Sequence, residues 1–367
     1  MCLWIHIALL LVLPIDGVAG ATEGVPSEKA TNISVGFQHA VALTSSGDLW
    51  AWGWNTSGQI GDGTTTERHK PVKVGGGFNF VATGYYHTIA LKPDGSLWAW
   101  GQNKYGQLGD GTTTDRPTPV QIGSGYSVVA AGVAHTIALK PDGSLWAWGW
   151  NSLGQIGDGT RTDRPTPVQI GEGFSAIVAA GQRTMALKSD GSLWAWGQNN
   201  YGQLGDGTTA DRSIPTEVGI GFSAVSASSW HTLALKSDGS LWGWGDNRNF
   251  ALGDGTNFSR NSPLQTGTGY SMISAGLWYS AALKPDGSMW TWGNNFNGQL
   301  GDGTTTYRRD AVQVGSGYKT VAAGTFNVIA IKSDGSWWVW GANLKGQLGD
   351  GSTSRRESPV SITLSSD

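Results

Sequence analysis

A repeat with a fixed period of 48 residues is the feature that most constrains what this chain can fold into. Seven Gly-Asp-Gly triplets mark the repeat, and they centre on Asp62, Asp110, Asp158, Asp206, Asp254, Asp302 and Asp350. Periods of about 20–50 residues are typical of solenoids, propellers and arrays, in which each unit completes its apolar core against its neighbours. The seven units account for residues 31–366.

The unit at residues 127–174 predicts four short strands. Its runs of β-branched and aromatic residues are 127–131, 135–139, 145–148 and 167–170. Pro141 and Gly143 between the second and third runs favour a tight hairpin turn. No run has the apolar spacing of a helix, and the 57 glycines would interrupt one. The fold class is therefore all-β, and four antiparallel strands in each of seven units predict a seven-bladed β-propeller.

A pair of tryptophans on alternate residues of each third strand predicts the core between the blades. The pairs are Trp50/Trp52, Trp98/Trp100, Trp146/Trp148, Trp194/Trp196, Trp242/Trp244, Trp290/Trp292 and Trp338/Trp340. Alternate residues of a strand point to one face, so both indoles of a pair are expected to be buried between neighbouring blades. The small residues of the first strand, such as Ala130 and Ala131, are expected beside the central axis.

Each blade is predicted to form from contiguous sequence, because every unit has its own first and fourth strands. The predicted blades are 31–78, 79–126, 127–174, 175–222, 223–270, 271–318 and 319–366. Closure of the ring would then depend on packing between the first and last blades. Nothing in the sequence indicates a second folded domain.

The unit closely resembles the regulator of chromosome condensation repeat, in the tandem form common in bacterial proteins. The resemblance is in the recurring pieces G-x-x-H-T-x-A-L, D-G-S-L-W-x-W-G and N-x-x-G-Q-L-G-D-G, and it covers residues 31–366. It implies a seven-bladed propeller. It does not imply one function, since similar proteins include a nucleotide exchange factor on chromatin, a plant ultraviolet-B photoreceptor and a secreted β-lactamase inhibitor. No unit has the G-W-R-H-T pattern of the photoreceptor, and the chain lacks a basic tail.

The first 21 residues predict a signal peptide. An apolar run over residues 5–12 is followed by Pro14 and by the small residues 19–21, which favours cleavage after Ala21. The run is shorter than the roughly 20 apolar residues of a membrane span, so no membrane association is expected after cleavage. Residues 22–30 are expected to be a linker, and the mature protein is expected to be secreted, periplasmic or in the cell envelope. The only cysteine is Cys2, so the mature chain would have no thiol.

The formal net charge of −3, with evenly spread Lys and Arg, argues against a nucleic-acid partner. A recurring column of His39, His87, His135 and His231 holds Arg183, Tyr279 and Asn327 in the other units. Metal binding and catalysis need unlike groups that converge on one point, so this column predicts structural hydrogen bonds.

The Asp of each Gly-Asp-Gly triplet is followed six residues later by Arg, as in Asp158 and Arg164. With a recurring Asn, such as Asn151, these residues are expected to order the long loop before the fourth strand. One carboxylate per unit falls short of the six to eight oxygens, roughly, that Ca²⁺ takes. The sequence therefore predicts no catalytic residue, no metal site and no cofactor, so the protein is not expected to be an enzyme.

The residues that vary between units predict the binding surface. The loop between strands one and two and the loop between strands three and four are expected to open on one face. The candidate binding residues in these loops are Phe37, Trp54, Tyr85, Tyr86, Trp150, Trp230, Asp246, Trp278 and Phe326. The first loop of unit 4 is expected to be shifted by one residue. The long loop of unit 5 is expected to have a different shape, because Phe250 and Ala251 replace Gly and Gln.

These observations predict an exported, non-enzymatic binding scaffold whose partner is another protein. One alternative is a lectin-like propeller, in which Tyr85, Tyr86, Trp230 and Trp278 would stack on sugar rings. A second alternative is a secreted enzyme inhibitor. A third is that the loop residues vary because selection on them is relaxed, and the sequence leaves these alternatives open.

Overall fold

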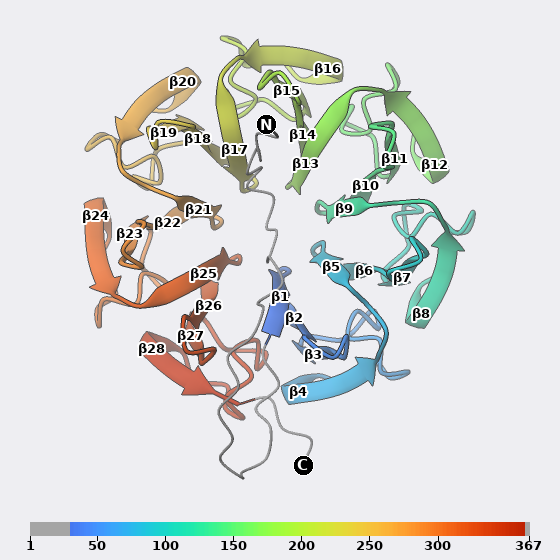
Figure 1. Cartoon of the computed structure of the whole chain (residues 1–367), viewed down its shortest axis with the longest axis horizontal. Helices are drawn as coiled ribbons and strands as arrows, with labels where there is room; N and C mark the ends of the chain where they lie inside the picture. The colour runs from blue at the N-terminus through green and yellow to red at the C-terminus, as the bar shows by residue number, and fades with distance from the viewer. Residues whose placement is uncertain (1–29, 364–367) are drawn as a thin grey trace, which may run out of the picture.

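A computed structural model describes residues 30–363, which form seven four-stranded sheets arranged in a ring (Figure 1). The predicted signal peptide and all but the last residue of the predicted linker lie outside the described residues. The described residues are all strand, turn and loop, with no helix, so none could cross a membrane as a helix. The all-β fold class and the seven-bladed propeller are confirmed.

Each blade is one sheet of four consecutive strands. Blades 1 and 2 contain β1 (Ala30–Val35), β2 (His39–Thr44), β3 (Leu49–Gly53), β4 (Arg68–Gly75), β5 (Phe80–Thr83), β6 (His87–Leu91), β7 (Leu97–Gly101) and β8 (Arg116–Gly123). Blades 3 and 4 contain β9 (Val128–Ala131), β10 (His135–Leu139), β11 (Leu145–Gly149), β12 (Arg164–Gly171), β13 (Phe174–Ala180), β14 (Arg183–Lys188), β15 (Leu193–Gly197) and β16 (Arg212–Gly219). Blades 5 to 7 contain β17 (Phe222–Ala227), β18 (His231–Lys236), β19 (Leu241–Gly245), β20 (Arg260–Gly267), β21 (Met272–Ala275), β22 (Tyr279–Leu283), β23 (Met289–Gly293), β24 (Arg308–Gly315), β25 (Tyr318–Ala323), β26 (Asn327–Lys332), β27 (Trp337–Gly341) and β28 (Arg356–Ile362).

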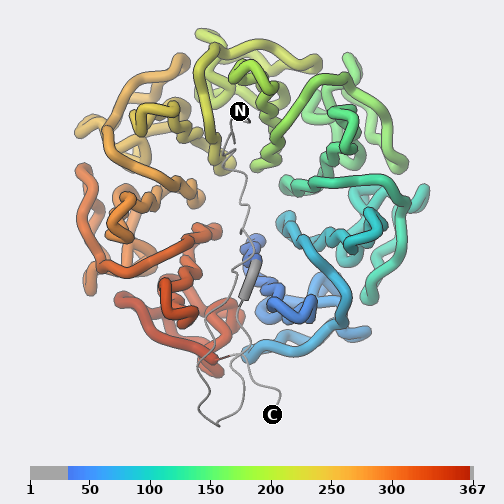
Figure 2. Tube along the Cα trace, in the orientation of Figure 1, coloured from blue at the N-terminus to red at the C-terminus, as the bar shows by residue number. Residues whose placement is uncertain are grey.

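Every sheet pairs its strands antiparallel in sequence order, from the first strand at the axis to the fourth at the rim. Figure 2 shows the chain going once around the ring, so that the first blade lies beside the last. In blade 3 the fourth strand begins three residues before the predicted 167, because Arg164 pairs with Gly149 across a bulge. A bulge adds an unpaired residue, and residue periodicity alone does not locate it.

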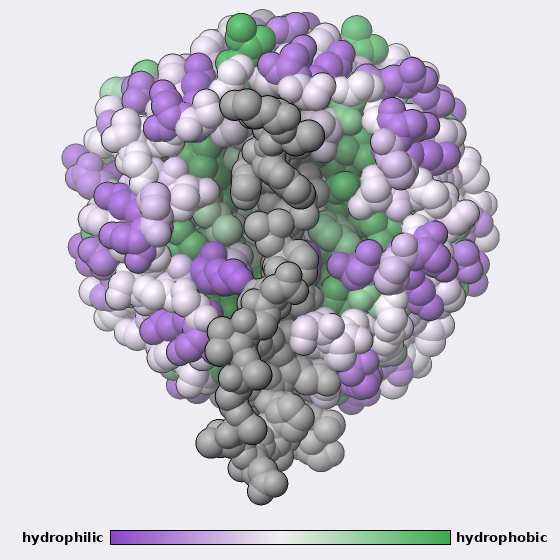
Figure 3. Space-filling model, viewed as in Figure 1, coloured by the Kyte–Doolittle hydropathy of each residue, from purple (hydrophilic) through white to green (hydrophobic). Residues whose placement is uncertain are grey.

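The first strands surround a central hollow. They contribute small and β-branched residues to it, and Figure 3 shows apolar side chains in its wall with hydrophilic residues around them. The hollow has a volume of about 260 Å³ and is lined by strands of all seven blades. The prediction that small residues lie at the axis is confirmed.

The apolar core lies between the blades. Trp148 is fully buried and packs with Leu91 and Leu97 of blade 2. The same kind of cluster closes the ring, since Trp52 packs with Val339 of blade 7 and donates a hydrogen bond to the carbonyl of Gln347 at 3.0 Å. Each blade is therefore completed by its neighbour, as the repeat predicts.

The two indoles of a pair differ in burial, which corrects the prediction that both are core. The second is fully buried in every blade, but the first is only partly buried in blades 2 to 7. Trp98, for example, donates to Ser96 Oγ at 3.2 Å, and Lys92 Nζ lies 4.4 Å from the centre of its ring. The first indole packs under a lysine on the flank of the blade, where its face also takes part in a cation–π contact.

Candidate binding face

The first loop and the long loop of each blade are joined by a backbone hydrogen bond, so both open on one face, which we call the loop face. The N–H of Trp54 donates to the carbonyl of Gln38 at 2.8 Å, and the N–H of Trp150 donates to that of Ala134 at the same distance. The equivalent bond is present in all seven blades of the described region. The predicted juxtaposition of the two loops is confirmed.

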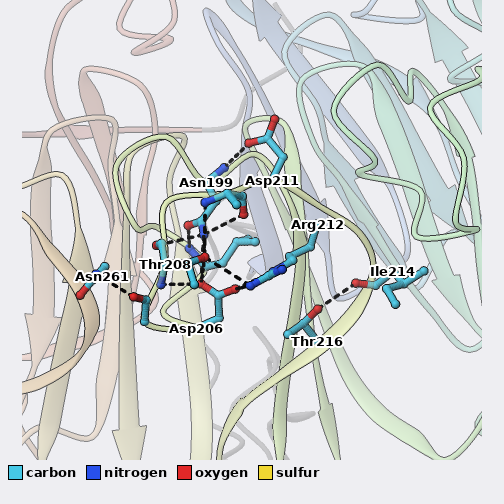
Figure 4. Close-up of polar contacts among 11 residues, drawn as sticks. Asn199, Asp206, Thr208, Asp211, Arg212, Ile214, Thr216 and Asn261 are labelled. Atoms are coloured by element: carbon cyan, nitrogen blue, oxygen red, sulfur yellow. Dashed lines mark hydrogen bonds and ion pairs between the residues drawn. The ribbon is translucent and has the colours of Figure 1, made fainter.

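Each long loop is held by a buried asparagine, shown for blade 4 in Figure 4. Asn199 Oδ1 accepts the N–H of Leu204 at 2.9 Å, and Nδ2 donates to Asp206 Oδ1 at 3.1 Å and to the carbonyl of Ala210 at 3.1 Å. Arg212 Nε donates to Asp206 Oδ2 at 2.7 Å. Desolvation raises the pKa of Asp206, but hydrogen bonds from Thr208 and Arg212 outweigh it and hold the pKa below its usual value. The predicted pairing of Asp with Arg occurs within each blade.

The histidine column joins neighbouring blades. His87 Nε2 lies 3.1 Å from Thr136 Oγ1 of the next blade, and Thr136 Oγ1 donates to the carbonyl of Gln107 at 2.8 Å. Because the threonine hydroxyl has one proton and gives it to that carbonyl, Nε2 must be the donor to the hydroxyl. Nε2 therefore has a proton, and complete burial lowers the pKa of His87 to about 3, which favours the neutral imidazole.

In two of the three blades where the column is not histidine, another group makes the same connection, whereas the buried amide nitrogen of Asn327 in blade 7 has no hydrogen-bond partner among the described residues. Arg183 in blade 4 donates to the carbonyl of His231 at 2.7 Å, and Tyr279 in blade 6 donates to the carbonyl of Asn327 at 2.7 Å. The prediction of structural hydrogen bonds is confirmed for these residues. Among residues 30–363 there is no group of three or more His, Cys, Asp or Glu side chains that could hold a metal ion.

The candidate aromatic residues gather into four groups, each shared by two neighbouring blades. Phe37, Trp54, Tyr85 and Tyr86 form the largest group, with ring centres 5.0 Å apart for Phe37 and Tyr85 and 5.3 Å apart for Trp54 and Tyr86. The other pairs are Trp150 with Tyr105 at 5.4 Å, Trp230 with Tyr201 at 5.4 Å, and Trp278 with Phe326 at 5.8 Å. The candidate aromatic residues are all partly buried, so each group presents part of its surface to solvent.

Tyr85 reaches across the axis. Its hydroxyl lies 2.8 Å from Ser229 Oγ, so blade 2 is bonded to blade 5 on the far side of the ring. Both residues line a cavity of about 110 Å³ to which all seven blades contribute. Tyr85 therefore closes the mouth of the central hollow, in addition to contributing to the aromatic surface.

Asp246 lies in the face as a buried supporting residue. Its carboxylate accepts the N–H of Arg248 at 3.0 Å and pairs with the guanidinium at 2.7 Å. The Arg248 Cζ lies 4.5 Å from the centre of the Tyr201 ring, and the side chain of Arg248 is 60% exposed. Asp246 thus positions Arg248 over the Tyr201 ring, and the exposed group at the surface is Arg248.

Sequence reasoning missed several residues of this face. Besides Tyr105, Tyr201 and Arg248, the long loops expose Phe258, Phe296, Tyr307 and Leu344. The signal for them is in the columns of the repeat: the residue after the buried asparagine is exposed in all seven blades. It is Phe296 in blade 6 and Leu344 in blade 7, where other blades have polar residues.

Two predictions about individual blades are wrong. The first loop of blade 4 is not shifted, since Arg183 pairs with Gly197 just as His135 pairs with Gly149. The long loop of blade 5 keeps the shape of the others, because Phe250 adopts a left-handed backbone with φ of 62° at a position where other blades have a left-handed glycine. Its N–H still donates to the carbonyl of Asn247 at 2.9 Å.

Comparisons with known proteins agree with this architecture. The sequence profile of the regulator of chromosome condensation (RCC1) repeat matches residues 46–91, 94–139, 142–187, 190–235, 238–283 and 334–367. A second profile of the same repeat matches residues 30–59, 78–107, 126–155, 174–203, 222–250 and 273–299. The first profile alone covers more than half of the chain.

Curated relatives match over about one repeat. The human E3 ubiquitin-protein ligase HERC2 is 46% identical over 54 residues, which are 15% of this chain and 1% of the ligase. The Arabidopsis thaliana ultraviolet-B receptor UVR8 is 42% identical over 52 residues, which are 14% of this chain and 12% of the receptor.

Solved structures match over most of the chain. Human WBSCR16 has a TM-score of 0.79 with 20% identity, covering 86% of this chain and 94% of that one. Prp20p from Saccharomyces cerevisiae, for which binding to Gsp1p and histones was studied, has a TM-score of 0.77 with 22% identity, covering 88% and 87%. At this identity the likeness shows the fold alone. Because the repeat profile matches more than half of the chain, the chain belongs to the RCC1 repeat family.

Proposed function

We propose that this protein is an exported, non-enzymatic scaffold that binds another protein through the loop face. One contrast supports the proposal. The residues that hold the blades together recur in each unit, whereas those that reach the surface of the loop face differ from blade to blade and are often aromatic. Partly exposed aromatic groups on a hydrogen-bonded frame are typical of protein interfaces.

The rigidity of the face favours binding. The long loops are ordered by buried asparagines and by seven Asp–Arg pairs, so little conformational entropy would be lost when a partner docks. One structural relative also binds proteins: the binding of yeast Prp20p to Gsp1p and histones was studied, and the same protein, yeast RCC1, was solved with Kap60 bound. Those partners belong to that protein, and the partner of this chain is to be identified by experiment.

Capture from the native extracellular fraction, run beside a glycan array, tests the class of partner. The tagged propeller is crosslinked in the fraction, and any captured protein is then purified and titrated against it. We expect a protein that binds saturably and no signal on the array. Saturable binding to a glycan, with no protein partner, would replace this proposal by the lectin-like alternative.

Export is proposed from the first 21 residues. Sequencing the N-terminus of the protein recovered from its native cell tests it. We expect the mature chain to begin at Thr22. Cytoplasmic protein that retains Met1 would contradict export and leave the binding proposal intact.

A further inference from the structure

The long loops expose large apolar side chains in one part of the ring only, whereas the partly buried aromatic groups described above lie around the whole loop face. Among the long loops in residues 30–363, the large apolar side chains that are exposed are Phe258 (67%), Phe296 (68%), Tyr307 (42%) and Leu344 (76%). They belong to blades 5, 6 and 7. Trp278 and Phe326, whose ring centres are 5.8 Å apart, lie in the first loops of blades 6 and 7. We call these six residues the apolar sector.

The same positions are polar or small in the other four blades. Phe296 and Leu344 replace Thr56, Lys104, Ser152 and Asn200. Phe258 replaces Thr66, Thr114, Thr162 and Ala210, and Tyr307 replaces Glu67, Asp115, Asp163 and Asp211. All seven long loops have the same backbone frame of asparagine and Asp–Arg hydrogen bonds. The long loops of blades 5 to 7 therefore differ from those of blades 1 to 4 in their exposed side chains and not in their hydrogen-bonded frame.

Exposure of large apolar side chains to water is unfavourable, so their presence here indicates an interaction site. The fold does not require phenylalanine or leucine at these positions, because the loops of blades 1 to 4 have the same frame with polar or small residues there. Clustered exposed apolar side chains with a polar rim mark interaction sites. Isolated apolar residues are normal on a surface, but these four lie in the long loops of three consecutive blades.

The charges of the long loops divide in the same way. Apart from the Asp of each Asp–Arg pair, the loops of blades 5 to 7 contain the cations Arg248, Lys345 and Arg355 and the buried carboxylate of Asp246. The loops of blades 1 to 4 contain two cations, Lys104 and Arg161, and four carboxylates, Glu67, Asp115, Asp163 and Asp211. The loops of blades 5 to 7 thus have three cations and one carboxylate, and those of blades 1 to 4 have two cations and four carboxylates, so the loops around the apolar sector are the less negative part of the face.

The cations beside the sector remain open to solvent. Lys345 Nζ contacts Glu67 at 2.8 Å and Arg355 contacts Glu357 at 2.9 Å, yet their side chains are 38% and 50% exposed. Exposed pairs of this kind are weak, so an incoming carboxylate can compete for the cation. Complementary charge around an apolar centre gives orientation and selectivity to a docking partner.

Building on the proposed function, we infer that the apolar sector is the docking site for a protein segment that has aromatic or aliphatic side chains flanked by carboxylates. Phe258, Phe296 and Leu344 would contact the apolar side chains, and Lys345 and Arg355 would face the carboxylates. The more negative part of the face, over blades 1 to 4, would disfavour the opposite orientation. Apolar contacts would thus form at the centre of the site, and charged groups around it would select the partner.

A phage-displayed library of random linear peptides, selected on the folded protein, tests this inference. The sector variant combines Phe258→Thr, Phe296→Ser and Leu344→Ser, which are the residues that blade 3 uses at these positions, Thr162 and Ser152. The control variant changes the same positions of the other blades, as Lys104→Ser, Thr162→Ala and Asn200→Ser. We expect enriched peptides to combine apolar residues with Asp or Glu, to bind the sector variant about tenfold or more weakly, and to bind the control variant unchanged. Their affinity should fall as salt is raised.

Three results would overturn the inference. They are an absence of enriched peptides, enrichment of peptides flanked by Lys or Arg, and equal binding to the sector variant and the native protein. A concentration-dependent dimer in sedimentation, lost in the sector variant, would instead assign the sector to a second copy of this chain. A partner protein could still bind through other aromatic groups of the loop face. The proposed function is therefore tested separately from this inference.

Discussion

Phe250 has a left-handed backbone at a position where the repeat requires this conformation. Other blades have glycine there, and in blade 2 a Cβ on Gly106 would lie 2.4 Å from the Cα of Pro165 in the next blade. Phe250 adopts the left-handed conformation without glycine, and its ring lies 5.1 Å from Arg309 Cζ of the next blade. The cation–π contact, worth about 0.5–1 kcal/mol at an exposed site, offsets part of the cost of the conformation.

Two substitutions separate these contributions. Phe250→Gly removes a left-handed cost of about 1–2 kcal/mol together with the ring contact, so its free energy of unfolding should lie within about 1 kcal/mol of the native value. Phe250→Val keeps the left-handed cost and adds a β-branched side chain. It should be less stable than the glycine variant by about 1–2 kcal/mol in chemical denaturation. Equal stability of the two variants would show that the left-handed backbone is not maintained.

Trp148 is the clearest test of the core between blades. Replacing it by Ala removes a fully buried indole, so the free energy of unfolding should fall by roughly 3–5 kcal/mol. Trp146→Ala is the matched control, since that indole is only partly buried, and its loss should be smaller. Urea denaturation followed by circular dichroism measures both. A loss below about 1 kcal/mol for Trp148→Ala would be incompatible with a large-to-small change in a packed core.

Among the elements, the long loop depends on one side chain. Asn199 is fully buried, and its side chain bonds to the middle of its loop at Leu204 and Asp206 and to the end at Ala210. Asn199→Ala should leave several buried polar groups without partners and destabilise the protein by about 3 kcal/mol or more. Hydrogen exchange should speed up at Leu204 and Thr208, whose amides are bonded in this network. Asn200→Ala, at the adjacent exposed residue, should change neither quantity; unchanged exchange in Asn199→Ala would contradict the role of the asparagine.

The elements also show what the sequence could and could not predict. The period, the turn residues and the alternating Trp pairs were sufficient for the blade count, the strand order and the loop face, because these features are local and recur seven times. The start of β12 at Arg164 and the partial exposure of Trp146 were missed. A bulge depends on pairing across strands, and partial exposure depends on the wedge shape between blades.

The candidate site was predicted in part for a similar reason. Aromatic residues next to the histidine column could be found by comparing units, and the structure groups them with their neighbours. The bond from Tyr85 to Ser229 could not be predicted, since it joins residues 144 apart across the axis. The role of Asp246 beneath Arg248 was missed because a charge in a variable loop was taken as exposed, whereas its carboxylate is bonded on two sides.

At the scale of the whole ring, the histidine column makes stability depend on pH. Burial lowers the pKa of His39, His87 and His231 to about 3 and that of His135 to about 4, while an unfolded chain has histidines near 6.5. The unfolded state therefore binds more protons below that value. The contribution of these histidines to the free energy of unfolding is fully present above about pH 6.5. It is lost as the pH falls toward 3, by about 1.4 kcal/mol per pH unit for each buried histidine.

Urea midpoints measured between about pH 7 and 4.5 test this dependence. His87→Asn introduces the residue that blade 7 has in this column. In this variant the free energy of unfolding should fall less steeply with pH, because one buried histidine is lost. The Asp–Arg pairs act at lower pH, since the pKa of Asp206 lies below its usual value and its contribution is lost only as the pH falls through that lower range. A midpoint that stays constant from pH 7 to 4.5, roughly, would contradict the neutral buried column.

The measurement that most directly tests the central claim is the affinity of the captured partner for a loop-face variant, compared with a variant elsewhere on the ring. The loop-face variant combines Tyr86→Ala, Trp230→Ala and Trp278→Ala, and it spares Tyr85 because of the bond to Ser229. The control is Ile220→Ser, which removes an exposed apolar side chain from the connection between β16 and β17, away from both loops of the loop face. We expect the Kd to rise about tenfold or more for the first variant and to stay unchanged for the second, with similar melting temperatures. An unchanged Kd for the folded loop-face variant would place the partner elsewhere and contradict this account.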